Sequence, residues 1–182
     1  GALASQTRTD GLSADEYRDV FMGRLNGLMI AQDLTIDETA PVDLRTLADR
    51  VLEPYADRIA IEAGDVSPLA GFQVRPLGMM LHELATNALK YGALSALQGR
   101  VRLAWSESES ENDGDARPVL SLRWTEENGP EVSPPDHEGF GTGMIRHFVE
   151  EIDGRLEMDF DARGLRIRID FPVGEEPATA AP

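Results

Sequence analysis

Cysteine is absent from this chain of 182 residues. Its absence excludes a disulfide framework and thiol chemistry, and it fits a reducing compartment. Long apolar runs are missing too, since no stretch approaches the roughly 20 apolar residues that a membrane-spanning helix needs. The chain does not open with the charged and then apolar segment of a secretory signal. We therefore expect a cytoplasmic protein whose chain has no membrane segment.

Basic residues are scarce: 17 Lys and Arg stand against 33 Asp and Glu, for a formal net charge of −16. A phosphate backbone would be repelled, which argues against nonspecific nucleic-acid binding. An anionic ligand would need a local cationic or amide-rich site together with a metal ion. An initiator methionine is also missing from the opening GALAS, and we expect a fragment of something longer.

Apolar residues, at 41% of the chain, suffice for the core of one compact domain with a short appendage. Residues 12–35 have helical spacing, with Ser13 as N-cap and Glu16 completing a capping box. Two interpretations stay open for this helix. It is either a core helix or a helix of a dimerising bundle, and the second would make the protein a homodimer through 12–35.

The remaining patterns divide into helices, strands and polar connections. Further helices are predicted from about 43 to Pro54, over 75–91 and over 143–152. Pro76 is placed in the first turn of the second of these helices, and Gly92 at its C-terminal stop. Alternating strands are predicted at 58–64, 99–108, 118–127, 155–161 and 164–172, with a short strand within 68–74. The acidic segment 108–117 reads as a hairpin loop, and the tail 174–182 as disordered. This order predicts an α+β fold, a two-layer α/β sandwich with helices on one face of a mixed, mostly antiparallel sheet.

The segment LHELATNALKYGALS (81–95) carries two faces on one helix. An apolar stripe that can pack on a sheet consists of Leu77, Met80, Leu81, Leu84, Ala85 and Ala88. Glu83, Asn87, Lys90 and Tyr91 align on a second face. An amide oxygen suits Mg²⁺, a carboxylate can orient a water, and an ammonium can meet a phosphate. Spacing alone allows a solvated polar face as well.

Two further blocks are consistent with a nucleotide site. EGFGTGMI (138–145) places Gly139, Gly141 and Gly143 before a helix, where exposed amides and the helix N-terminus favour anions. A turn that needs positive φ would also use glycine. In RWTEENGP (123–130) a strand runs into a turn, and Glu126 could accept a hydrogen bond from an exocyclic amine.

The three blocks, in this order, resemble the N, G1 and G2 boxes of the ATP-binding domain of two-component sensor histidine kinases. That domain shares a superfamily with DNA gyrase and MutL. More narrowly, the chain resembles the HWE subgroup, marked by a His in the N box, here His82, and a Trp-x-Glu in the G1 box, here Trp124 and Glu126. The resemblance covers about residues 12–172. It implies the Bergerat-type ATP-binding fold, preceded by a helical segment.

The resemblance also implies roles for individual residues. Asn87 matches the Mg²⁺ ligand, and Glu83 the acid that positions water near the metal. Glu126 stands where most kinases carry the Asp that reads the adenine amine. The other positions implied to bind nucleotide are His82, Lys90, Tyr91, Gly129, Gly139, Gly141, Thr142 and Gly143, with Lys90 also counted as catalytic. Trp124 is expected to serve packing.

The chain departs from the family pattern in three places. The usual Asp-x-Gly-x-Gly of the G1 box is Glu126-Glu127-Asn128-Gly129-Pro130, and the lid at about 132–138 is short. The three histidines are His82, His137 and His147, so residues 1–35 hold none. We expect the phosphoacceptor His to precede residue 1. Residues 1–36 would be a remnant of the dimerisation helices, 37–173 the ATP-binding domain and 174–182 a tail.

The resemblance thus predicts transfer of the ATP γ-phosphoryl to a His on a separate helix, in cis or in trans. An Asp of a response regulator would then receive it. Two alternatives remain. One is a binding module, such as a degenerate phosphotransfer or anti-sigma domain. The other is an ATPase of the same superfamily with Glu83 as general base.

Overall fold

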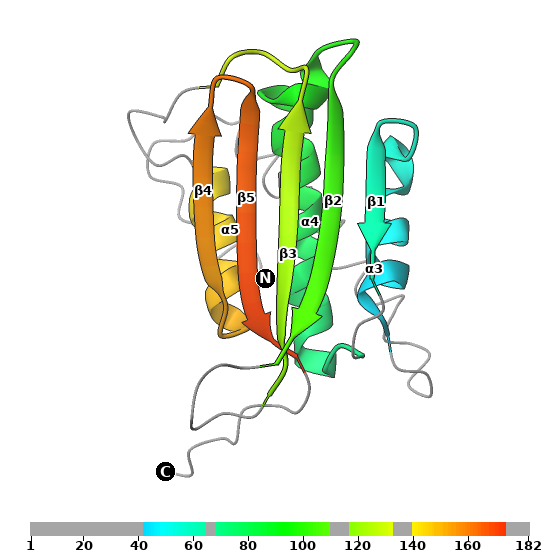
Figure 1. The fold of residues 1–182 in the computed structure, drawn as a ribbon, viewed down its shortest axis with the longest axis vertical. Helices are drawn as coiled ribbons and strands as arrows, with labels where there is room; N and C mark the ends of the chain where they lie inside the picture. Colours follow the sequence, from blue (N-terminus) through cyan, green and yellow to red (C-terminus); the bar gives the residue numbers. More distant parts are fainter. Residues whose placement is uncertain (1–41, 65–67, 110–116, 133–139, 174–182) are drawn as a thin grey trace, which may run out of the picture.

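The structure is a computed structural model that describes residues 42–64, 68–109, 117–132 and 140–173. The predicted helix at 12–35, the lid, Gly139, His137 and the tail lie outside these ranges. Within the ranges, no helix combines the length and apolar character needed to cross a membrane. The described elements form one sheet covered on one side by helices (Figure 1).

The first described helix, α3 (Leu44–Leu52), begins where the sequence predicts it. The Asp43 carboxylate accepts a hydrogen bond from the Thr46 amide at 2.6 Å and caps the helix. Pro54 follows in the 3₁₀ turn η1 (Glu53–Tyr55), so the α-helix ends just before it, as expected.

Five strands form a sheet in the order β1-β2-β3-β5-β4. They are β1 (Ile59–Ala63), β2 (Arg100–Ser108), β3 (Val119–Glu127), β4 (Arg155–Asp161) and β5 (Gly164–Pro172). β1 pairs parallel with β2, since a helix connects them, and the other pairs are antiparallel. The predicted α+β sandwich and its strands are confirmed, except for the strand within 68–74.

That segment instead starts the long helix α4 (Gly71–Lys90). The Gln73 side chain accepts from the Ala70 amide at 3.0 Å and donates to the Pro172 carbonyl at 2.7 Å. This buried glutamine caps the helix and fixes its start to the end of β5. Pro76 is therefore well inside the helix, not in its first turn as predicted. The prediction was wrong because the capping contact with β5 is distant in sequence.

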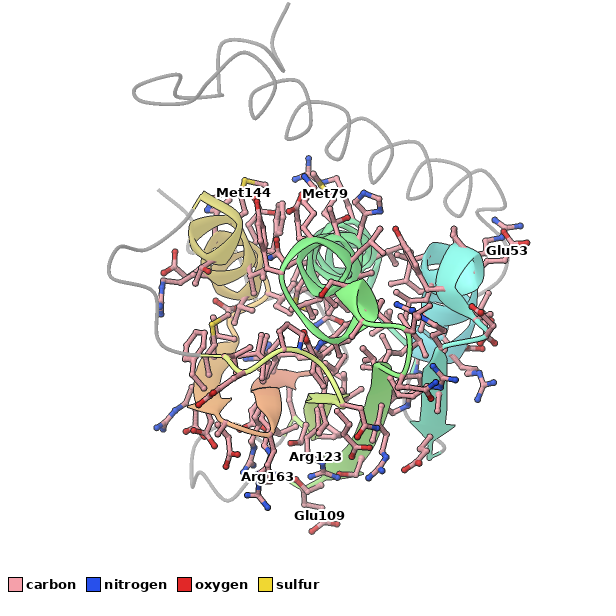
Figure 2. The ribbon with its side chains drawn as sticks, turned by 90° about the horizontal axis from the view of Figure 1, so that it is seen from above. Glu53, Met79, Glu109, Arg123, Met144 and Arg163 are labelled. Carbon is pink, nitrogen blue, oxygen red and sulfur yellow. The ribbon has the colours of Figure 1, made fainter. Side chains whose placement is uncertain are left out.

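The helix α5 (Phe140–Glu151) begins earlier than the predicted residue 143. Gly141 and Gly143 are thus in its first turn, whereas the sequence placed them in a loop before it. The helix α4 packs between α3 and α5 in one layer (Figure 2). The predicted apolar stripe of α4 faces the sheet and is buried throughout. Its opposite face is left to carry the polar side chains.

Candidate nucleotide-binding site

The polar face of α4 is placed as the helical spacing predicts. Glu83 and Asn87 are half-buried, while Lys90 is exposed at the last residue of the helix. Tyr91 caps the C-terminus and is 73% exposed. An amide, a carboxylate and an ammonium therefore lie within two turns on one side of a rigid helix, where water and a ligand can reach them.

Asn87 lies against Gly141, which joins two of the blocks that are separate in the sequence. A methyl group placed on Gly141 would come within 3.0 Å of Asn87 Nδ2 and 3.1 Å of Asn87 Oδ1. Any side chain at Gly141 would therefore press on the amide of Asn87. The packing of α4 on α5 thus brings a hard oxygen donor to the positive end of a helix.

The first turn of α5 supplies the glycine block. Gly141, Thr142 and Gly143 are all half-buried, and a methyl group on Gly143 would meet nothing within 4 Å. The first amides of a helix have no partner within the helix, so they can donate to an anion. This geometry favours phosphate binding beside Asn87.

Glu126 at the end of β3 is buried, with only 3% of its surface exposed. Its Oε2 accepts from the Ala93 amide at 2.6 Å, and its Oε1 accepts from Trp124 Nε1 at 3.1 Å. Burial raises the pKa of this carboxyl group, although both hydrogen bonds act in the opposite direction. Both oxygens of the predicted adenine reader thus already have donors inside the protein.

The turn after β3 lies on the segment that follows α4. Asn128 has a positive φ of 58°, which reverses the chain there. A methyl group on Gly129 would overlap the backbone of Ala93. Gly129 is therefore brought to the short 3₁₀ turn η2 (Ala93–Ser95), beside Glu126. The G1-like block and the segment that follows α4 are in direct contact.

The two described histidines occupy different surroundings. His82 is half-buried, and burial lowers the pKa of its imidazole, which is neutral at pH 7. His147 is exposed on α5, as predicted for a helix-surface residue, with its Nε2 at 3.1 Å from Glu151. Neither was predicted to accept a phosphoryl group, and both lie on helices, α4 and α5, that pack against each other.

Sequence reasoning missed the hydrogen bonds from Trp124 and Ala93 to Glu126. Part of the signal was present, because residues two apart in a strand share a face of the sheet. The partner Ala93 gave no signal, since any residue offers a backbone amide.

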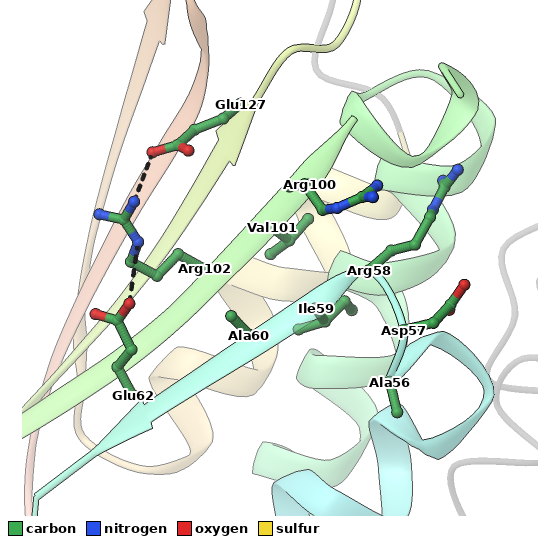
Figure 3. Close-up of a pocket in the computed structure, with 10 residues that line it drawn as sticks. All are labelled: Ala56, Asp57, Arg58, Ile59, Ala60, Glu62, Arg100, Val101, Arg102 and Glu127. Carbon is green, nitrogen blue, oxygen red and sulfur yellow. Dashed lines mark hydrogen bonds and ion pairs between the residues drawn. The ribbon is translucent and has the colours of Figure 1, made fainter. Parts of the chain in front are cut away.

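A separate pocket of about 340 Å³ lies where β1 and β2 meet (Figure 3). Arg58, Arg100 and Arg102 line it, and none of the predicted site residues does. Arg102 is paired with Glu62 at 3.3 Å and with Glu127 at 3.1 Å. Arg58 and Arg100 donate to backbone carbonyls. Since the three cations already have partners in the protein, we assign no ligand to this pocket.

Among the described residues, no group of three or more His, Cys, Asp or Glu side chains could hold a metal ion. A dedicated carboxylate cage is therefore not part of the described site. Mg²⁺ commonly binds through one or two protein oxygens together with substrate phosphates and waters. The donor set around Asn87 and Glu83 fits that kind of site.

Comparisons with known proteins found similar sequences and folds. A family model described as HWE histidine kinase matches residues 1–65. The chain is 39% identical over 182 residues to blue-light-activated histidine kinase 1 of Erythrobacter litoralis (strain HTCC2594), covering 94% of this chain and 48% of the relative. A blue-light-activated histidine kinase of Brucella ovis is 29% identical over 180 residues, covering 96% of this chain and 36% of the relative. The chain thus spans about half or less of these relatives' length.

Solved structures show the same fold. The histidine kinase domain of the Erythrobacter litoralis EL346 blue-light activated histidine kinase superposes with a TM-score of 0.61 at 18% identity, covering 84% of this chain and 74% of that one. The catalytic domain of histidine kinase ThkA gives a TM-score of 0.53 at 12% identity, covering 72% and 93%. At these identities the likeness concerns the fold.

Proposed function

We propose that the chain belongs to the HWE histidine kinase family, whose model matches residues 1–65, as its 39% identity to a blue-light-activated histidine kinase supports. Residues 37–173 would bind ATP and transfer its γ-phosphoryl group to a histidine imidazole. The acceptor would lie on a dimerisation helix, and a response-regulator Asp would receive the phosphoryl group next. The observation that carries this proposal is the contact between the Asn87 amide and Gly141 at the start of α5.

Each predicted residue has a task that its position supports. The amides in the first turn of α5 would donate to phosphate oxygens. Lys90, exposed at the end of α4, would meet a phosphate as a point charge. Such local positive groups are needed because the chain as a whole carries a net charge of −16.

Metal binding fits the same residues. The Asn87 amide oxygen would be the protein ligand of Mg²⁺, and the Glu83 carboxylate would orient a water beside it. When bound, the metal neutralises charge that develops on the phosphates. His82, which is neutral at pH 7, would lie beside the nucleotide without adding charge.

The base side of the site would involve Tyr91, Glu126 and Gly129. Glu126 is predicted to accept from the adenine amine, and a carboxylate has about four lone-pair sites for donors. Since Trp124 and Ala93 use two of these sites, its lone pairs could still accept from a further donor. Catalysis would then consist of positioning and charge neutralisation.

Calorimetry and a phosphate-release assay test this function. We expect the chain to bind Mg·ATP and to prefer it over Mg·GTP, with no steady phosphate release when no acceptor is supplied. The ATPase alternative predicts steady release that Glu83→Gln abolishes. The binding-module alternative predicts no transfer of the γ-phosphoryl group to an acceptor helix supplied in trans, and that result would overturn the proposal.

A further inference from the structure

Four glycines from different segments converge on Ala93 and Glu126. A methyl group on Gly92 would overlap the Glu126 carboxylate, and one on Gly164 would overlap the Glu126 carbonyl oxygen. Methyl groups on Gly99 and Gly129 would overlap the backbone of Ala93. Gly164 also has a φ of +136°, which other residues rarely adopt. The turn η2 is therefore closely packed against β3 and its neighbours, with no space for a methyl group at these glycines.

The hydrogen bonds at this junction run from Trp124 to the last turn of α4. Trp124 Nε1 and the Ala93 amide both donate to the Glu126 carboxylate. One residue before Ala93, the Gly92 amide donates to the Asn87 carbonyl at 3.2 Å, and the Tyr91 amide donates to the same oxygen at 2.8 Å. Two hydrogen bonds, through the adjacent residues Ala93 and Gly92, thus connect the buried Glu126 carboxylate to the backbone of Asn87, the proposed metal ligand.

The other side of η2 is held by Arg58 from the loop before β1. Its Nη1 donates to the Ala96 carbonyl at 3.1 Å, and its Nη2 donates to the Leu94 carbonyl. Ser95 Oγ donates to the Gly92 carbonyl at 2.7 Å within the turn itself. A turn fixed from both sides in this way can keep the end of α4 in one position.

From this arrangement we propose that Trp124 and Glu126 are positioning residues. They fix η2 and thereby hold Asn87 and Lys90 where the nucleotide needs them. This inference rests on the proposed function. It also gives Glu126 a role besides binding adenine, because both of its oxygens accept from the protein before any nucleotide binds.

The chain contains a matched control for this idea, since it has only two tryptophans. Trp124 is 0% exposed and Trp105 is 3% exposed, but Trp105 Nε1 has no hydrogen-bond partner. Trp124→Phe and Trp105→Phe therefore both remove a buried indole, and only Trp124→Phe removes a hydrogen bond to Glu126. Glu126→Gln keeps the side-chain volume but offers one acceptor to two donors.

Nucleotide affinity gives the first readout, measured by calorimetry where circular dichroism shows every variant folded. The probes are Mg·ATP, Mg·GTP and Mg·tripolyphosphate, and the last has no base. For Trp124→Phe we expect affinity for all three to fall by a similar factor, about three- to tenfold, the scale of one hydrogen bond. For Glu126→Gln we expect a fall of that size for all three and a larger one for ATP, because the proposed contact with the adenine amine is weakened as well. Trp105→Phe should bind like the unmodified chain.

Lys90 gives a second readout that needs no nucleotide. It is the only lysine of the chain, so the rate of acetylation at Lys90, followed by mass spectrometry, reports on that position alone. We expect this rate in the free protein to change by about twofold or more in Trp124→Phe and Glu126→Gln and to stay constant in Trp105→Phe.

Two results would overturn the positioning role. One is a Trp124→Phe protein that matches Trp105→Phe in both affinity and Lys90 reactivity. The other is a Glu126→Gln protein that loses affinity for ATP while GTP and tripolyphosphate are unaffected, since that pattern assigns Glu126 to the base alone. If the unmodified chain binds none of the probes, the proposed function fails. The Lys90 rates still decide the positioning role in that case.

Discussion

The proposed metal site depends on the side-chain amide of Asn87. It is half-buried on α4 and lies against Gly141. Asn87→Ala removes the oxygen ligand, so affinity for Mg·ATP should fall by about tenfold or more, the scale of one lost contact to a charged group. Affinity for ATP without metal should change much less. Calorimetry with Mg²⁺ and with EDTA measures both values.

The neighbouring Thr86→Ala serves as the control, because Thr86 is also half-buried on α4 and has no predicted contact with nucleotide. It should leave both affinities close to those of the unmodified chain. An equal loss for Asn87→Ala with and without Mg²⁺ would refute its role as a metal ligand.

His82 should make the stability of the protein depend on pH. Burial lowers its pKa in the folded state, so the unfolded chain binds more protons just below about pH 6.5. Its contribution to stability is complete above that pH and is lost as the pH falls toward the lowered folded pKa. Relative to His82→Gln, the free energy of unfolding of the natural chain should therefore drop between about pH 7.5 and about pH 5.5.

Urea denaturation at several pH values measures that difference. His147→Gln is the control for removing a histidine, because His147 lies on the surface of α5. A constant difference between the natural chain and His82→Gln across this range would show that burial does not perturb His82.

At the scale of elements, Gly141 and Gly143 lie in the same turn of α5 but have different surroundings, because α4 packs against α5. A methyl group on Gly143 meets nothing, whereas one on Gly141 meets the Asn87 amide at 3.0 Å. Gly143→Ala should raise the free energy of unfolding by about 0.5–1 kcal/mol, since alanine favours a helix more than glycine does. Gly141→Ala should gain less and should weaken Mg·ATP binding by roughly three- to tenfold.

Thermal or urea unfolding and calorimetry on the same two proteins give these values. Because the two substitutions are identical in chemistry and lie in one helical turn, each is the control for the other. Equal nucleotide affinity in both variants would mean that the contact between Gly141 and Asn87 does not shape the binding site.

At the scale of the whole molecule, we expect this chain to bind ATP but not to phosphorylate itself. The second expectation follows from the positions of the described histidines. His82 is held on a rigid helix and His147 is paired with Glu151 on the surface of α5. Phosphoryl transfer requires near in-line approach of the imidazole at contact distance. A dimerisation helix that carries an acceptor histidine, supplied in trans, should be labelled from γ-labelled ATP only with Mg²⁺.

The label should be acid-labile and base-stable, as a phosphoramidate is. Asn87→Ala with the same helix is the control for transfer that depends on the site. Labelling of a histidine in the 182-residue chain itself, mapped by mass spectrometry, would contradict the prediction. His137 or His147 would then need a catalytic role.

The sequence alone determined the faces of α4 and the strand pattern, because helical and strand periodicities are local and sort apolar from polar side chains. It also placed Glu83, Asn87 and Lys90 on one face. It misplaced the starts of α4 and α5, since both begin at or beside glycines that local propensity disfavours. A contact with the end of β5 offsets that preference in α4.

Only the tertiary structure decided which distant groups meet. The contact of Asn87 with Gly141 and the hydrogen bond from Ala93 to Glu126 join residues 54 and 33 positions apart. Neither follows from periodicity, because a backbone amide and a glycine have no side-chain pattern. They arise when helices and sheet pack closely enough that a buried carboxylate must find its donors inside the protein.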